Sequence, residues 1–328
     1  MAKKITVLGG GTGSYAVLTA LKNTHNIDLA AIVTMMDSGG STGKLRDQLG
    51  VLPPGDLRQC LVALSEAPEI WRKLFTYRFT QGDLKGHNFG NLFISVLEKV
   101  TANYDEVLDE AHYVMQCVGR VIPATLTRAD IHATYTTGRV VESEKWLDES
   151  NPDNATIVSA VASPPVSANP KALERVRNSE YIIAGPGDLY SSIISIALAD
   201  GFPEALQSSK AKIIFIMNLM TKSSQTMGYG AWEHLTDFKK YFGRIPDVCI
   251  INTASVSDAM KKQYEQYSEE LVRNNLSEHG YTGEVIATDL LDRTDYVYDE
   301  SQSLAATFAH SIVRHDIQKL QTVLRSLV

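Results

Sequence analysis

Short runs of apolar and β-branched residues alternate with helical patterns along the whole chain. The runs expected to form buried strands are Ile5–Leu8, Leu29–Met35, Thr156–Val161, Tyr181–Ala184, Lys212–Met217 and Val248–Ile251. Between them, apolar residues recur at spacings of three and four, which is the helical period. Strands that are apolar throughout and separated by helices are typical of a parallel sheet covered on both faces. The sequence therefore predicts an α/β fold built on a mostly parallel sheet.

One stretch departs from this alternation. Apolar and polar residues alternate through Arg128–Glu142, and Gly138 lies at a turn, as in a β-hairpin. We expect a small β-hairpin subdomain, inserted at about 126–150, within a domain that spans residues 1–302. Residues 303–328 carry a long amphipathic pattern, and this C-terminal helix either packs on the core or forms a homodimer contact. Its periodicity fits both.

Composition excludes several classes of protein. The 31 Lys and Arg residues against 38 Asp and Glu residues give a net charge of −7, which argues against a nucleic-acid binder or an anionic-membrane binder held by bulk charge. No stretch approaches the about 18 apolar residues of a membrane span. The apolar run Ile5–Leu8 is too short for a signal peptide, and the three cysteines lack metal-site spacing. We expect a cytoplasmic protein without a nucleic-acid partner.

The first strand runs into Gly-Gly-Gly-Thr-Gly-Ser and then a helix. Backbone N–H groups at such a turn, together with the helix dipole, favour a phosphate. The phosphate-binding candidates are Gly10, Gly11, Thr12, Gly13 and Ser14. From Gly11 the turn also fits the dinucleotide form G-x-G-x-x-A, with Asp37 where a ribose-binding acid is expected. The alternative is a tight turn that needs glycine only for packing.

A second glycine-rich element, Asp-Ser-Gly-Gly-Ser-Thr-Gly-Lys-Leu-Arg, begins at Asp37. It lacks the G-x-x-x-x-G-K-[ST] order of a P-loop. We interpret it as a loop that binds an anion or a sugar phosphate, with a mobile surface loop as the alternative. Its candidate ligand-binding residues are Asp37, Gly39, Gly40 and Ser41.

The segment Leu-Pro-Pro-Gly-Asp-Leu-Arg places Asp56 and Arg58 at the start of a helix. Asp56 either caps that helix or forms a carboxylate pair with Asp37 that holds Mg²⁺ against a diphosphate. Asp37 and Asp56 are thus the metal-binding candidates, and they are the catalytic candidates only if the protein is a transferase. Arg58 is a further ligand-binding candidate.

More polar residues lie in loops that follow strands or open helices. They are His87, Asn88 and Asn91 at a helix start, Gly185, Pro186, Gly187 and Tyr190 after one strand, and Asn218 and Thr221 after the next. In an open parallel sheet, ligands bind outside the carboxyl ends of the strands. We therefore expect these loops to converge there.

Taken together, GGGTGS, DSGGSTGKLR, LPPGDLR, GHNFGN, GRVIPAT, GPGDLYSS and NLMT resemble the motifs of the CofD-like family, and within it the bacterial YvcK branch of gluconeogenesis factors. The resemblance runs from about residue 5 to residue 255. It implies a Rossmann-like, doubly wound fold and a cytoplasmic regulatory protein that binds UDP-sugars such as UDP-N-acetylglucosamine. It links this protein to gluconeogenic growth, cell-wall precursor supply and cell shape.

The other branch supplies the alternative function. Its members are 2-phospho-L-lactate transferases, which use Mg²⁺ and a lactyl donor linked to guanosine diphosphate. The resemblance places the first glycine turn and Asp37 at the nucleotide, Asp56 near the metal, and the turn 185–187 at a phosphate. Mg²⁺ is the one cofactor that the sequence suggests, and whether the protein is an enzyme stays open.

Two departures from the family pattern affect this choice. Ser38 stands where the YvcK branch usually has a second acid, and Ser224-Gln225 stands where Gly-Glu is expected. Each departure removes a carboxylate near the expected site, which weakens the expectation of metal-dependent transfer. A nicotinamide dehydrogenase is disfavoured by the second glycine loop.

Overall fold

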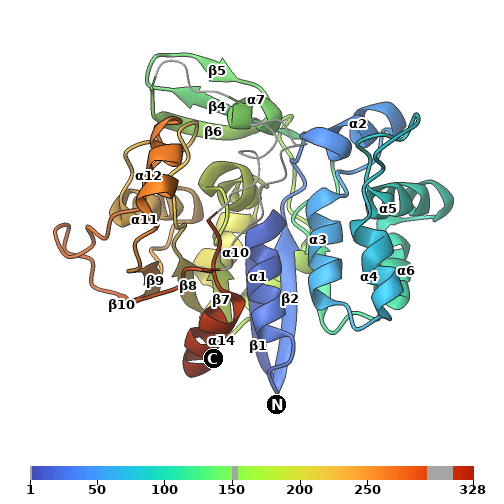
Figure 1. Ribbon diagram of the computed structural model, residues 1–328. Helices are drawn as coiled ribbons and strands as arrows, with labels where there is room; N and C mark the ends of the chain where they lie inside the picture. Colours follow the sequence, from blue (N-terminus) through green and yellow to red (C-terminus); the bar gives the residue numbers. More distant parts are fainter. Residues whose placement is uncertain (1, 150–153, 294–312) are drawn as a thin grey trace.

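Seven parallel strands form the central sheet of the protein (Figure 1). The structure is a computed structural model, and it describes residues 2–149, 154–293 and 313–328. The strands are β1 (Lys3–Gly9), β2 (Ile27–Val33), β3 (Arg120–Pro123), β7 (Tyr181–Ala184), β8 (Lys212–Ile216), β9 (Val248–Asn252) and β10 (Glu284–Thr288). Their order is β10-β9-β8-β7-β1-β2-β3. The predicted α/β fold with a doubly wound sheet is confirmed.

Helices cover both faces of this sheet, as predicted. One face carries α1 (Gly11–Leu21), α3 (Gly55–Leu64), α5 (Phe89–Val100), α6 (Tyr104–Met115) and α14 (Ile317–Leu327). The other face carries α8 (Pro170–Arg177), η1 (Leu189–Ile194), α9 (Ser195–Ala197), α10 (Phe202–Ser208) and α11 (Ala231–Phe242). Alternate residues of β1 serve the two layers, since Val7 packs with α1 and Leu8 with the opposite layer. The helices α2 (Gly40–Leu49), α4 (Glu69–Thr76) and α12 (Asp258–Glu265) lie among the connections.

The strand order reverses between β1 and β7. From β1 the chain builds outward through β2 to β3, and it then returns to place β7 on the other side of β1. In doubly wound sheets this switch point opens the crevice in which ligands bind. The fold therefore directs attention to the loops that follow β1 and β7.

A small antiparallel sheet contains β4 (Asp130–Tyr135), β5 (Val140–Val141) and β6 (Ile157–Ser163), with α7 (Glu144–Glu149) beside it. The predicted hairpin is confirmed as β4 and β5. The strand expected near residues 156–161 forms, but assigning it to the parallel sheet was wrong, because β6 pairs with β4. Only Ile157 and Ala160 of β6 are buried and its other residues are more open, which suits a sheet covered on one face. Figure 1 shows this small sheet beyond the carboxyl ends of the main strands.

The end of the chain packs on the first helix. Leu320 and Leu324 of α14 are fully buried in the cluster that includes α1, and Gln321 Nε2 donates to the carbonyl oxygen of Ala20 at 2.8 Å. Residues 303–312 of the expected C-terminal helix lie outside the described residues. Within the described ranges, no helix combines the length and the apolar character that crossing a membrane demands.

Candidate functional site

Two glycine turns meet at the switch point of the sheet. One follows β1 and the other follows β7, and they approach so closely that a Cβ on Gly13 would lie 1.9 Å from the carbonyl oxygen of Pro186. The backbone N–H of Gly187 donates to Asn218 Oδ1 at 2.9 Å, which adds the loop after β8. The predicted convergence of these three loops is thus present in the structure. Glycine is needed here because the backbones touch.

The N-terminus of α1 faces this junction. Its N-cap, Gly10, supplies no side-chain cap, and its first turn carries no acidic residue. Ser14, in the same turn, is 1% exposed, and its Oγ has no hydrogen-bond partner among the described residues. Buried hydroxyls are normally satisfied by protein, water or ligand. The turn therefore combines the positive end of a helix dipole with an unsatisfied buried hydroxyl.

Asp56 lies directly beneath the first glycine turn. A Cβ on Gly10 would lie 1.9 Å from Asp56 Oδ2, and the Gly11 backbone N–H donates to the Asp56 carboxyl group. Asp56 does not cap α3 as the sequence suggested, because Pro54 occupies the N-cap and no side chain caps it. Desolvation by burial, the largest cause, and the charges of Asp37 and Asp188 together raise the pKa of Asp56 to about 8.

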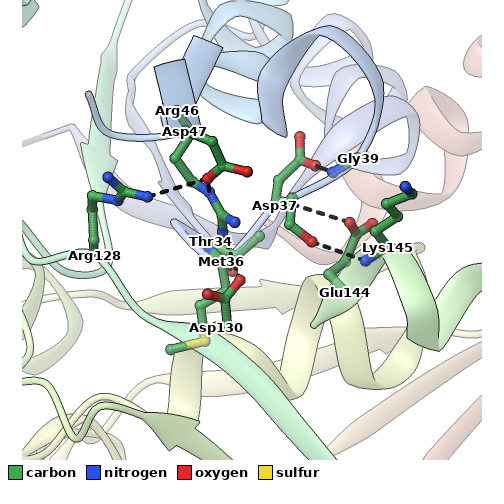
Figure 2. Close-up of polar contacts among 11 residues, drawn as sticks. Thr34, Met36, Asp37, Gly39, Arg46, Asp47, Arg128, Asp130, Glu144 and Lys145 are labelled. Atoms are coloured by element: carbon green, nitrogen blue, oxygen red, sulfur yellow. Dashed lines mark hydrogen bonds and ion pairs between the residues drawn. The ribbon is translucent and has the colours of Figure 1, made fainter. Parts of the chain in front are cut away.

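Asp37 belongs to the loop between β2 and α2. Its Oδ1 accepts a hydrogen bond from the Gly39 N–H at 2.8 Å (Figure 2). A Cβ on Gly55 would lie 2.8 Å from Asp37 Oδ2, so the carboxylate reaches the start of α3 next to Asp56. The structure therefore brings together the two acids that the sequence paired.

The second glycine loop is tied to the inserted sheet, as Figure 2 shows. The Ser38 N–H donates to Glu144 Oε2 at 3.2 Å, and the Lys145 N–H donates to Ser38 Oγ at 2.9 Å. On α2, the buried Arg46 guanidinium pairs with Asp130 of β4 at 2.6 Å. Side chains from the insert thus hold the loop that carries Asp37.

A polar network joins the N-termini of α2, α3 and α5. Arg58 Nε donates to Asn91 Oδ1 at 2.8 Å, and Asn91 Nδ2 contacts Ser41 Oγ at 3.5 Å. His87 Nδ1 lies 3.2 Å from the same Ser41 oxygen, and Asn88 caps α5 through the Asn91 N–H. Burial, the largest cause, and the nearby Arg78 charge lower the pKa of Arg58 to about 10. All five predicted residues therefore share one network next to Asp37.

Two other predicted residues have different surroundings. The Tyr190 side chain is fully buried in the layer under α11, and its hydroxyl donates to Asp237 Oδ2 at 2.5 Å, so only its backbone faces the turn after β7. Thr221 is 2% exposed and pairs through Oγ1 with the Glu270 N–H at 2.9 Å. The structure places neither side chain with the glycine turns.

The sequence interpretation missed a set of charged residues beside the second turn. Asp188, directly after Gly187, pairs with Lys222 Nζ at 2.5 Å, and Glu269 Oε1 accepts from the Ser223 N–H at 3.2 Å. Burial, more than any other cause, raises the pKa of Glu269, and the Lys222 charge acts in the opposite direction. The signal for Asp188 was its place after a strand-end glycine turn. Its pairing with a residue 34 positions later needs the folded chain.

Two hollows lie at opposite ends of the sheet. A cavity of about 220 Å³ lies at the carboxyl ends of β8 and β9, where Asn218, Asn252 and Arg273 are among its lining residues. A larger one, about 540 Å³, lies between α4 and α6 around Trp71 and Tyr113. The larger hollow is next to the residues that precede β3, at the amino ends of the strands, where open α/β sheets do not bind ligands. Position in the fold therefore favours the smaller one.

The side chains that could bind a metal ion are few at this site. Across residues 2–149, 154–293 and 313–328, no group of three or more His, Cys, Asp or Glu side chains is arranged to hold one. Asp37 and Asp56 lie together as a pair, and their metal-binding role stays a prediction.

Comparisons with known proteins agree with this architecture. The family described as 2-phospho-L-lactate transferase CofD matches residues 5–291. A protein of Bacillus subtilis called gluconeogenesis factor is 31% identical over 99% of this chain and 98% of its own length. Another of that name, from Halalkalibacterium halodurans, is 35% identical over 82% of this chain and 84% of its own. A crystal structure of a UPF0052 family protein from Bacillus halodurans superposes with a TM-score of 0.87, at 30% identity and 99% coverage of both chains.

Proposed function

The chain belongs to the CofD family, and from that premise we propose that it binds a nucleotide diphosphate ligand at the carboxyl ends of β1 and β7. The ligand is a UDP-sugar of the UDP-N-acetylglucosamine type. The protein acts in the cytoplasm as a regulator that senses this ligand and does not consume it.

The observation that carries this proposal is the junction of the two glycine turns. Both turns present backbone at the switch point, and Gly13 and Pro186 are in contact there. The N-terminus of α1, which has no acidic residue in its first turn, suits a diphosphate. Ser14 Oγ supplies the hydroxyl that the described protein atoms leave unsatisfied.

The residues next to the glycine turns contact the ribose and the sugar of the ligand. Asp37, beside Gly39 and Gly55, accepts hydrogen bonds from ribose or sugar hydroxyls. His87, within 3.2 Å of Ser41, forms the polar wall opposite the turns. Two relatives are called gluconeogenesis factors, which supports a regulatory role in growth on gluconeogenic carbon sources.

The family description and one feature of the site favour a second candidate function. The charge of Asp37 helps to raise the pKa of the neighbouring Asp56, and perturbed carboxyls of this kind gather at catalytic sites. In a transferase of the 2-phospho-L-lactate type, the two acids would lie against the reacting diphosphate, and the protein would mainly position donor and acceptor.

The proposal is tested by calorimetric titration with UDP-N-acetylglucosamine, with GDP in parallel, and by mass spectrometry of the recovered ligand. A regulator binds the UDP-sugar and returns it unchanged. Preference for GDP, together with turnover of a donor linked to guanosine diphosphate that is abolished in Asp56→Asn while binding persists, would establish the transferase instead. If neither nucleotide binds, the proposed site is wrong.

The chain offers a matched pair of variants for this titration. Ser14 and Thr19 both lie on α1, and both have a buried hydroxyl without a partner among the described residues. Only Ser14 lies at the turn. Ser14→Ala should weaken binding about five- to tenfold, the value of a hydrogen bond of about 1 kcal/mol, whereas Thr19→Val should leave affinity unchanged. Equal effects of both would remove Ser14 from the site.

A further inference from the structure

The loop after β8 brings a lysine to the second glycine turn. Lys222 Nζ lies 2.5 Å from Oδ2 of Asp188, the residue that follows Gly187. The Lys222 and Asp188 side chains are 23% and 35% exposed, so the ion pair is partly shielded from water. An ion pair in such a position is screened less than one on the open surface.

Other carboxyl groups surround this pair. The negative charge of Asp188 acts on both Asp56 and Glu269, and the positive charge of Lys222 acts on Glu269. Glu269 is held by the Ser223 N–H at 3.2 Å, next to Lys222 in the chain. Lys222 is therefore the cation that pairs with Asp188 and acts on Glu269, whereas Arg58 acts on Asp56.

The residues present offer Mg²⁺ the pair Asp37 and Asp56, without the further acids of the family pattern. No group of three metal-ligating side chains exists among the described residues. Ser38, in place of an acid, uses its Oγ to accept from the Lys145 N–H. Gln225, also in place of an acid, accepts from the Tyr190 N–H through Oε1 and donates to Ser191 Oγ through Nε2. Both replacements have become structural.

We propose that Lys222 is the resident cation of the site and takes, against the ligand's diphosphate, the place that a divalent ion would otherwise hold. An ammonium group carries three donors on a flexible stem, so it can keep its bond to Asp188 and donate to phosphate oxygens at the same time. This inference rests on the proposed function and adds to it that nucleotide binding needs no metal.

The test compares affinity for UDP-N-acetylglucosamine in EDTA and in Mg²⁺. The unsubstituted protein should bind equally in both. Lys222→Gln should bind about tenfold or more weakly in EDTA, the range of a hydrogen bond to a charged group, because the acids repel the diphosphate without their cation. Mg²⁺ should restore part of that loss, since Asp188 is then available to a metal. Lys222→Arg should stay close to the unsubstituted protein.

Two further variants separate this role from a structural one. Lys212→Gln is the control, because Lys212 also pairs with an acid, Glu284, at 3.2 Å, but it lies at the opposite end of β8. It should not change affinity. The double variant Lys222→Gln, Asp188→Asn also removes the acid that Lys222 pairs with, and it should bind weakly in EDTA and gain less from Mg²⁺ than Lys222→Gln does.

The outcomes distinguish this inference from the proposed function. Binding that requires Mg²⁺ in the unsubstituted protein, or that survives Lys222→Gln unchanged in EDTA, overturns the role of Lys222 and leaves the proposed function standing. If the unsubstituted protein binds no nucleotide in either buffer, both are overturned.

Discussion

The two glycine-rich elements look alike in sequence but are built differently. In the turn after β1, a Cβ on Gly13 would fall 1.9 Å from a backbone oxygen of the turn after β7. In the loop after β2, Gly40 has a φ of +46° and open space around it, and the loop is held by contacts to the inserted sheet. The first element packs against the backbone of another turn. The second packs on its own backbone, where a Cβ on Gly43 would lie 2.0 Å from the Ser38 carbonyl oxygen, and it is held from outside by Glu144 and Lys145 of α7. Glycine content alone therefore does not identify a rigid phosphate-binding turn.

The largest expected effect tests the packing of the first turn. Gly13 lies within α1, where alanine would ordinarily stabilise the helix by about 1 kcal/mol. Because the new methyl group meets the Pro186 carbonyl, we expect Gly13→Ala instead to lower the free energy of unfolding by about 3 kcal/mol and to abolish nucleotide binding. Urea denaturation and calorimetry measure the two effects.

Gly40→Ala is the comparison for the second loop. Its cost is expected to be about 1–2 kcal/mol, from the left-handed backbone alone, because no neighbour obstructs the methyl group. A cost for Gly40→Ala equal to or above that of Gly13→Ala would remove the distinction between the two elements.

The next effect tests the side chains that hold the second loop. Arg46 is 9% exposed at its side chain and pairs with Asp130 at 2.6 Å. Arg46→Met leaves that acid without its partner, and we expect a loss of about 2 kcal/mol in the free energy of unfolding. The control is Arg120→Met, because the Arg120–Asp109 pair is 3.5 Å long and well exposed, and its loss should cost under about 0.5 kcal/mol. Similar losses in both variants would contradict the idea that the insert fixes the loop.

The third effect is a pH dependence under the first turn. Below about pH 3 Asp56 is protonated whether the chain is folded or unfolded. As pH rises toward the folded-state pKa of about 8, the unfolded chain loses this proton first, so Asp56 makes the protein less stable. Above that pKa the cost is constant.

Asp56→Asn should remove this dependence. Its advantage in the free energy of unfolding over the unsubstituted protein should grow between pH 5 and 8, by at most about 1.4 kcal/mol per pH unit. Urea denaturation at several pH values measures it, with the exposed Asp83→Asn as a control. A constant difference across this range would show that Asp56 titrates normally.

Much of the first element could be predicted from the sequence. An apolar run followed by glycines and a helix fixes the turn locally, and parallel strands bring such turns to one edge. The strand order that places β7 beside β1 is what makes Gly13 meet Pro186, and no local pattern encodes it. The sequence therefore located the turns but not their contact.

The differences between the sequence interpretation and the structure have physical causes in tertiary packing. Tyr190 follows a glycine turn, yet its ring, in the π-helix that begins at Leu189, lies under α11, where its hydroxyl donates a hydrogen bond to Asp237. The apolar sequence of β6 predicted a strand of the main sheet, but β6 pairs with β4 in the small antiparallel sheet. The strand β10 was not predicted, because its residues are mostly exposed and do not form a buried apolar run. In each case the partner lies far away in the sequence.

The central claim is that the junction of the turns at β1 and β7 holds a diphosphate. A crystal structure of the protein grown with UDP-N-acetylglucosamine tests it most directly. The account predicts the diphosphate on the backbone of residues 10–13 and 185–187, with Ser14 Oγ within hydrogen-bond distance. A ligand bound instead in the larger hollow around Trp71 and Tyr113, with the glycine turns empty, would contradict it.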